Sequence, residues 1–158
     1  MTRGQIAAAT LVVIVAVSCK PAPALKPCLQ FSADLMPDLA NGLSRKDFRI
    51  ANAWAVKSDQ TIDSSGVKVP AYFLSADIIA PSGEPVVGTW ITTDVARPGL
   101  IYSLSPQARK YSNWLPAGSP ATAGITTETP GVKESITCVL SGRAKSPQPG
   151  VAPGAATP

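Results

Sequence analysis

The stretch VPAYFLSADIIAPSGEPVVGTWITT, residues 69–93, decides the fold of this chain. Both of its halves are rich in β-branched and aromatic residues, which fit the pleated surface of a β-strand. The intervening PSGE contains turn-forming residues and has the length of a hairpin connection. We therefore predict two antiparallel strands, residues 69–80 and 85–93, joined by a short turn.

The strand pattern continues on both sides of this hairpin. Short segments with turn chemistry, such as SSG and ARPG, separate the runs of apolar residues. Further strands are predicted at 48–56, 99–105 and 132–140, helices at 34–46 and 105–114, and a long loop at 116–131. This order predicts an α+β domain: an antiparallel sheet of four to five strands, with an N-terminal helix and a second short helix packed on it.

Helix signals support the two helices. Leu35, Leu39 and Leu43 recur at intervals of four residues and form an apolar stripe. Asp34 suits the N-cap of this helix and Pro37 its first turn, while Gly42 weakens it. Ser105 and Pro106 predict the start of the second helix.

Composition excludes several classes of function. The 158 residues contain no histidine, which removes Ser-His-Asp and Cys-His catalysis and histidine-bound zinc. The net charge is +4, and the basic residues are scattered along the sequence without forming a dense run. This distribution is typical of ordinary solubility, so we expect no nucleic-acid partner.

The N-terminus is typical of an exported protein. Residues 1–5 carry Arg3, and residues 6–17 are free of charge. A helix of twelve residues would be about 18 Å long and too short to span the roughly 30 Å hydrocarbon core of a membrane. A signal peptide over residues 1–18 fits better than a buried core helix, because the KPAP that follows would break the helix.

The residues Ala16, Val17, Ser18 and Cys19 resemble the lipobox of bacterial lipoproteins, although Ala16 stands where that family prefers Leu. The resemblance implies that Cys19 receives a diacylglyceryl group and becomes the new N-terminus, with palmitate among its acyl chains. Two acyl chains anchor a protein stably where one does not. We therefore expect a lipid anchor at Cys19 on the extracytoplasmic face of the cell membrane. Ordinary secretion is the alternative, since Ala-x-Ser also satisfies the small-x-small cleavage rule.

The three cysteines fit this interpretation. If Cys19 carries lipid, Cys28 and Cys138 remain, and in an oxidising compartment these two would pair as a disulfide. Two unpaired, buried thiols are the alternative. Residues 19–27 then form a lipidated, Pro-rich tether, residues 28–143 a single domain, and residues 144–158 a disordered tail rich in Pro, Ala and Gly.

Several residues are candidates for a functional site. Ser65 and Lys68 match the SxxK pattern of serine acyl-transfer enzymes, but that chemistry needs a helix start and these residues lie in a predicted turn. Asp59 and Asp63 lack the spacing of a calcium loop and suit Asx turns. Asp77 interrupts an apolar strand and needs either a partner or an edge position. Three aromatic residues are either core or an exposed binding platform: Trp90, Tyr102 and Trp114.

The motifs YFLSADI, GTWITT and GLIYSLSPQARKYSNW, with a cysteine near the end, resemble small lipoproteins of actinobacteria and their phages. That resemblance implies no activity and no catalytic residue. We expect a lipid-anchored, non-enzymatic domain that uses no cofactor or metal and binds a protein or envelope component. One alternative is a phage-encoded lipoprotein that excludes a second phage. Another is an enzyme acting through Ser65 and Lys68.

Overall fold

The computed structural model describes residues 25–81, 83–97 and 99–145. The predicted Cys19 anchor, the signal peptide and most of the predicted tail lie outside these residues. The elements run in the order β1 (Leu29–Gln30), η1 (Ala33–Leu35), α1 (Met36–Asn41), β2 (Arg49–Ser64), β3 (Val67–Ile79), β4 (Val86–Thr92), β5 (Ile101–Ser103), α2 (Pro106–Tyr111), η2 (Pro120–Thr122) and α3 (Val132–Lys145).

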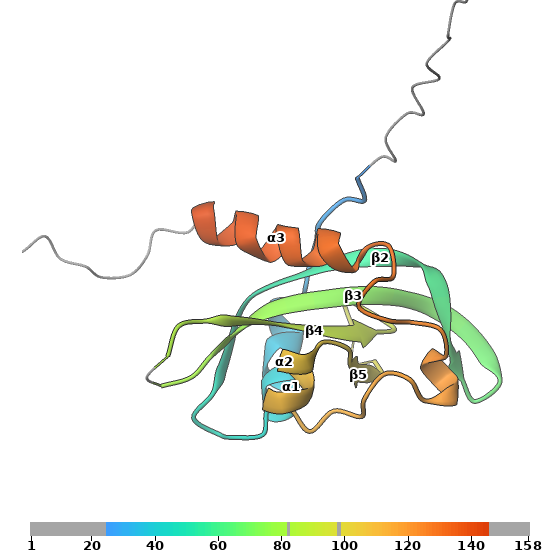
Figure 1. Ribbon diagram of the computed structural model, residues 1–158, viewed down its shortest axis with the longest axis horizontal. Coiled ribbons are helices and arrows are strands. Elements are labelled where there is room, and N and C mark those ends of the chain that lie inside the picture. The colour runs from blue at the N-terminus through green and yellow to red at the C-terminus, as the bar shows by residue number, and fades with distance from the viewer. Residues whose placement is uncertain (1–24, 82, 98, 146–158) are drawn as a thin grey trace, which may run out of the picture.

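The strands form one antiparallel sheet in the order β1-β2-β3-β4-β5 (Figure 1). The hairpin predicted over residues 69–93 is confirmed, with Tyr72 opposite Thr92 and Ile78 opposite Val86. The α+β class and the antiparallel meander are also confirmed. β5 is shorter than the predicted strand 99–105.

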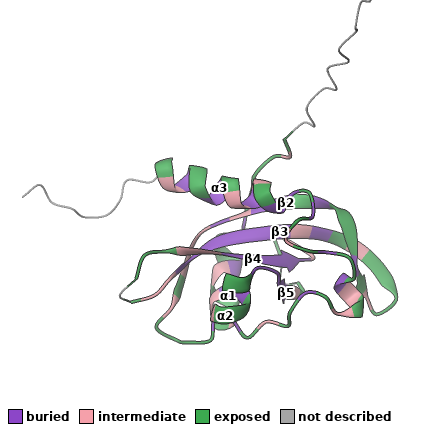
Figure 2. Cartoon of the chain, in the orientation of Figure 1, coloured by how far each residue is buried: buried purple, intermediate pink, exposed green. Residues whose placement is uncertain are grey.

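Helices cover both faces of the sheet. In Figure 1, α3 lies over one face, and α1 and α2 lie against the other. Side chains alternate along β3, so that Ser75 and Asp77 contact α3 while Leu74 and Ile78 join the cluster under α1. Figure 2 shows β3 and β4 largely buried, as expected for strands covered on both sides.

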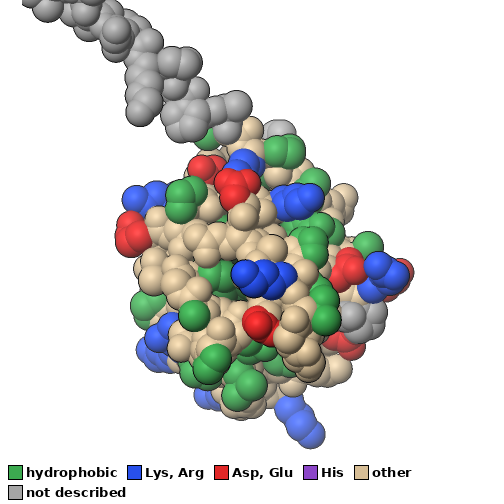
Figure 3. Space-filling view, turned by 90° about the vertical axis from the view of Figure 1, so that its right-hand side faces the viewer, with side chains coloured by type: hydrophobic (Ala, Val, Ile, Leu, Met, Phe, Trp, Pro, Cys, Tyr) green, Lys and Arg blue, Asp and Glu red, His purple; other side chains and the backbone are tan. Residues whose placement is uncertain are grey.

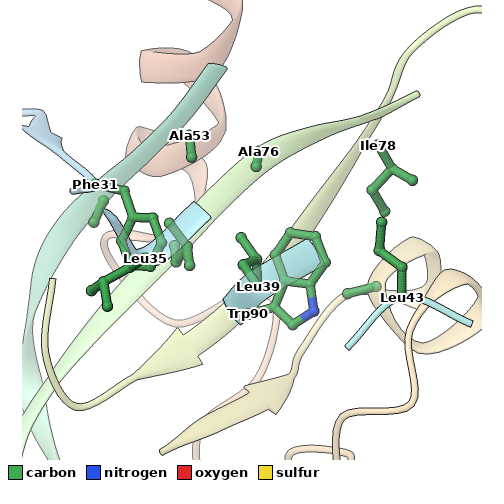
Figure 4. Packing of buried hydrophobic residues seen from close by; sticks show 11 residues of the cluster. Phe31, Leu35, Leu39, Leu43, Ala53, Ala76, Ile78 and Trp90 are labelled. Atoms are coloured by element: carbon green, nitrogen blue, oxygen red, sulfur yellow. The ribbon is translucent and has the colours of Figure 1, made fainter. Parts of the chain in front are cut away.

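Leucines and a tryptophan fill the face that carries α1. In Figure 4, Leu35 lies beside Phe31, Leu39 beside Trp90, and Leu43 near Ile78. All three leucines belong to one buried cluster, which confirms the predicted leucine stripe. Leu39 and Trp90 have no solvent exposure. Fully burying side chains of this size stabilises the fold by about 1.5–3 kcal/mol each.

The helix that carries this stripe is shorter than the predicted 34–46. α1 ends at Asn41, and Asp34 lies inside the preceding η1 rather than at an N-cap. The reason is tertiary hydrogen bonding: Ser44 donates its N–H to Tyr111, and the carbonyl of Gly42 accepts from Asn113. These backbone hydrogen bonds take the place of those that would extend the helix beyond Asn41. Pro37 in the first turn of α1, and Ser105 and Pro106 at the start of α2, lie as predicted.

The predicted strand 132–140 is wrong, because this segment is the first part of helix α3. Its buried positions follow helical spacing: Val132, Ser135, Cys138, Val139 and Gly142. Two of these five are polar or lack a side chain, so the apolar pattern alone did not show the stripe. Glu134 accepts the N–H of Gly131, a capping arrangement at the start of the helix.

Two other boundaries differ from prediction. β2 extends to Ser64 through the polar KSDQTIDS segment, past the predicted end of this strand at residue 56. Its pairing with β3 explains the extension, since Ile62 opposite Val69 is fully buried. α3 extends to Lys145, past the predicted start of the tail at residue 144.

A disulfide joins Cys28, at the beginning of the described chain, to Cys138 in α3. This is the pairing that the cysteine count favours over two free thiols. Among the described residues, no helix has the length and apolar character needed to cross a membrane.

Candidate functional site

The three aromatic residues for which the sequence allows a binding platform do not form one. Trp90 is fully buried in the cluster under α1, and Tyr102 is buried on the opposite face with Ile91 and Leu104. Trp114 is half-buried against the first of these clusters. The core interpretation is therefore correct for Trp90 and Tyr102, and Trp114 alone borders a cavity.

That cavity lies between η1–α1 and the loop linking β4 to β5. Its volume is about 360 Å³, within the range of roughly 300–1,000 Å³ that is usual for small-molecule sites. Apolar side chains provide one part of its wall: Phe31, Leu35, Ile101 and Trp114. Polar and charged side chains provide the rest: Asp38, Asn41, Thr92, Asp94 and Arg97. The combination of an apolar wall with a few polar groups is typical of a ligand site.

Asp94 organises the β4–β5 loop at the border of this cavity. Its carboxylate accepts the backbone N–H groups of Ala96 (2.8 Å) and Arg97 (3.2 Å) and contacts the Arg97 side chain. The Ala96 N–H lowers the pKa of Asp94 most; burial opposes this effect, and the Arg97 N–H and guanidinium add to the lowering. Asp94 therefore stays ionised at neutral pH and orders the loop.

The same loop also borders a second, more open hollow of about 950 Å³. The lining of this second hollow includes Pro70 and Tyr72 of β3 together with Leu100. Asp94 and Arg97 belong to both hollows. The loop thus places one carboxylate and one guanidinium between two surfaces that can receive apolar groups.

Gly42 determines where Trp114 lies. A Cβ atom at position 42 would come within 2.0 Å of the indole nitrogen Nε1, so any side chain there would displace the ring. The indole N–H is buried, and no acceptor reaches it among the described residues. An unsatisfied buried donor is uncommon in native proteins, and here it belongs to a residue of the cavity wall.

No protein-family model, curated protein or solved structure matches this chain.

Asp77 has partners inside the fold and is not a free acid. Arg143 of α3 donates to both of its oxygens, and Asn52 donates to Oδ2 at 3.2 Å. The hydrogen bond to Asp77 raises the pKa of Arg143. Asn52 also donates to the carbonyl of Val139 (2.7 Å), and it accepts from the indole of Trp54 (2.8 Å). Of the two alternatives that the sequence leaves open for Asp77, a partner or an edge position, the structure shows a partner, and this network attaches α3 to the sheet.

A β-bulge brings Asn52 into this network. Asn52 and Ala53 of β2 together oppose the single residue Ala76 of β3, and Asn52 has a φ of 50°. Left-handed backbone is tolerated by Asn better than by most residues. The extra residue directs Asn52 toward α3 and leaves Ala53 in the cluster under α1.

Ser65 and Lys68 lie exposed at the β2–β3 hairpin, and no hydrogen bond joins their side chains within the described part of the chain.

The two aspartates of this region have partners within the fold. Asp63 accepts the N–H of Gly66 (2.7 Å), as expected in a turn, and Asp59 pairs with Lys26 at 2.6 Å. Within the described residues, His, Cys, Asp and Glu form no group suited to a metal ion.

Sequence reasoning missed the cavity itself. The sequence predicts the segment ARPG only as a turn between strands, and it predicts no site role for Asp38. The available signal was Asp94 ahead of the ARPG turn, because an aspartate side chain often accepts the backbone N–H of the residue two positions later in an Asx turn. Nothing in the sequence indicated that Phe31, 63 residues earlier, would form the opposite wall.

Proposed function

We propose that this chain is a lipid-anchored, extracytoplasmic domain that binds a small ligand or side chain in the cavity beside the β4–β5 loop. The observation that carries the binding role is the cavity, with its apolar wall and its charged border. The lipobox-like residues before Cys19 support the anchor. The disulfide between Cys28 and Cys138 supports export, since such bonds persist in oxidising compartments.

The charges around the cavity favour a ligand with an apolar body and a positively charged end. Arg97 is engaged by Asp94 at 3.3 Å. Asp38 lies on the exposed side of α1 and makes no ion pair within the described residues. One carboxylate therefore remains for a cation, in a wall that also contains the aromatic rings of Phe31 and Trp114. Aromatic rings attract cations.

Benzylamine has this chemistry and serves as the probe. In an NMR titration we expect shift changes at Phe31, Asp38, Arg97 and Trp114. Asp38→Asn should weaken binding about two- to fivefold, the range of one exposed charge interaction. Asp34→Asn is the matched control, because Asp34 lies one turn earlier and does not line the cavity. Equal binding of benzoate, or shifts confined to other surfaces, would contradict the proposed ligand class.

The anchor is tested separately by metabolic labelling with palmitate and membrane fractionation. Cys19→Ala should abolish labelling and release the protein from the membrane fraction. Cys28→Ala is the control and should still be labelled, since only Cys19 follows a lipobox-like sequence. A Cys19→Ala protein that stays membrane-bound would rule out the anchor.

A further inference from the structure

Basic residues that are scattered in the sequence gather at one end of the molecule. Arg45, Lys46 and Arg49 belong to the turn between α1 and β2 and the start of β2, and Lys110 belongs to α2. Backbone contacts hold the two segments together: Ser44 donates its N–H to Tyr111 at 2.9 Å, and Leu43 forms a bridge with Ser112. We call these four cations the basic end.

Aromatic rings fix two of the four cations. The Arg45 guanidinium lies 5.2 Å from the centre of the Phe48 ring, and the Lys110 ammonium lies 5.1 Å from that of Tyr111. The two rings meet edge to face at 5.6 Å. The result is a continuous stack of cation, ring, ring and cation. Held in this way, the cations lose less side-chain freedom when they bind an anion.

The charge is concentrated at this end. Asp47, which pairs with Arg45, is the one carboxylate in ion contact with the four cations among the described residues. The basic end therefore carries a net charge of +3, against +4 for the whole chain. By contrast, acidic, basic and hydrophobic side chains are interspersed on the face shown in Figure 3.

The position of the basic end relative to the membrane favours one class of partner. In Figure 1 the turn between α1 and β2 lies below the sheet, whereas the described chain begins above it, on the side of α3. If Cys19 anchors the chain, as proposed above, this end faces away from the bilayer. We propose that the basic end binds a polymer of repeating phosphate groups in the cell envelope. Closely spaced phosphates suit arginine, which binds them through two N–H groups, and lysine, which binds them as a point charge.

Inorganic polyphosphate is the probe, and the protein is the full exported chain with Cys19→Ala, so that no lipid contributes. Two variants with the same change in net charge are compared. Lys46→Glu with Arg49→Glu alters the basic end, and Lys57→Glu with Lys68→Glu alters exposed lysines farther along the β2–β3 hairpin. All four side chains are exposed, and thermal unfolding checks that both variants fold.

We expect polyphosphate to bind at low salt, with a dissociation constant that rises with ionic strength. Removing two phosphate contacts should reduce the slope of log K against log salt by about 2 in the first variant only. Equal weakening in both variants, or no binding by the parent protein, would overturn the proposal. So would equally tight binding, through the same residues, to vesicles of phosphatidylcholine and phosphatidylglycerol in equal parts. Palmitate labelling of Cys19 is a separate readout, so failure of the anchor and failure of the basic end are distinguishable.

Discussion

The two faces of the sheet are covered in different ways. On the face that carries α1, hydrophobic side chains such as Leu39 and Trp90 are packed without solvent exposure. On the other face α3 is attached by specific bonds, among them the Asp77–Arg143 pair and the Cys28–Cys138 disulfide. The first face depends on buried area, which many side chains share. The second combines a hydrophobic cluster, which includes Phe73 and Val132, with a few specific partners, each of which a single substitution can remove.

The largest effect is expected from breaking the apolar face at its centre. Trp90→Ala should lower the free energy of unfolding by about 4 kcal/mol, because it leaves a large cavity under α1. It also removes the hydrogen bond from the indole to Ser112 at 3.2 Å. Urea unfolding measures the loss. Leu115→Ala is the control, since Leu115 is 68% exposed and should change little.

The contrast between the two faces of the sheet explains which parts of the fold the sequence predicts. The hairpin at 69–93 and the leucine stripe of α1 consist of apolar residues at regular spacing, so the pattern and the structure agree. The stripe of α3 includes Ser135 and Gly142. Ser135 is buried because it hydrogen bonds to Ser75 at 2.8 Å, and Gly142 because any side chain there would meet Asn52. The spacing of apolar residues in the sequence cannot reveal positions that are buried for these reasons.

The next largest effect is expected from removing the covalent link to α3. Cys28 and Cys138 are 110 residues apart. In the chain-entropy model a loop of this size stabilises the fold by about 4.7 kcal/mol, and measured values are typically about 2–4 kcal/mol. Cys28→Ala with Cys138→Ala should therefore lose about 3 kcal/mol in urea unfolding. Hydrogen exchange should rise more in α3 than in α1. An equal rise in both helices would show that the disulfide supports the whole domain rather than one face.

A smaller effect is expected from the polar network under α3. Asp77 is buried, but a third of the Arg143 side chain reaches solvent. Asp77→Ala should therefore cost about 2 kcal/mol, less than the 3–5 kcal/mol of a fully buried pair. A double-mutant cycle with Arg143→Ala measures their coupling in urea unfolding. The matched control is the cycle of Arg45→Ala and Asp47→Ala, an exposed pair, for which we expect no resolvable coupling. Similar coupling in both cycles would mean that burial does not strengthen the α3 pair.

The functional surfaces were less predictable than the fold, for a related reason. The cavity joins Phe31, Asp38, Arg97 and Trp114, and the basic end joins Arg45 with Lys110. Each set comes from segments that are far apart in the sequence. The charged residues among them have no periodicity, since exposed side chains carry no packing pattern. Their proximity follows from the backbone contacts between residues 42–44 and 111–113 and, in the cavity, from the hydrogen bond that the Ser32 N–H donates to Val95. No local pattern indicates these contacts.

The smallest effect is expected at the β4–β5 loop, which lies beside the face that carries α1. The pKa of Asp94 is lowered in the folded protein, chiefly by the Ala96 N–H. Its contribution to stability is therefore complete above the unfolded pKa of about 4 and is lost as the pH falls through the folded value. Asp94→Asn should cost about 0.5 kcal/mol at pH 7 and less at pH 2, measured by urea unfolding at each pH. Thr93→Val is the control in the same loop, because it removes an uncharged bond to the Leu100 N–H (3.1 Å). Its cost should be the same at both pH values. If Asp94→Asn costs as much at pH 2 as at pH 7, the contribution of Asp94 comes from packing rather than from its charge.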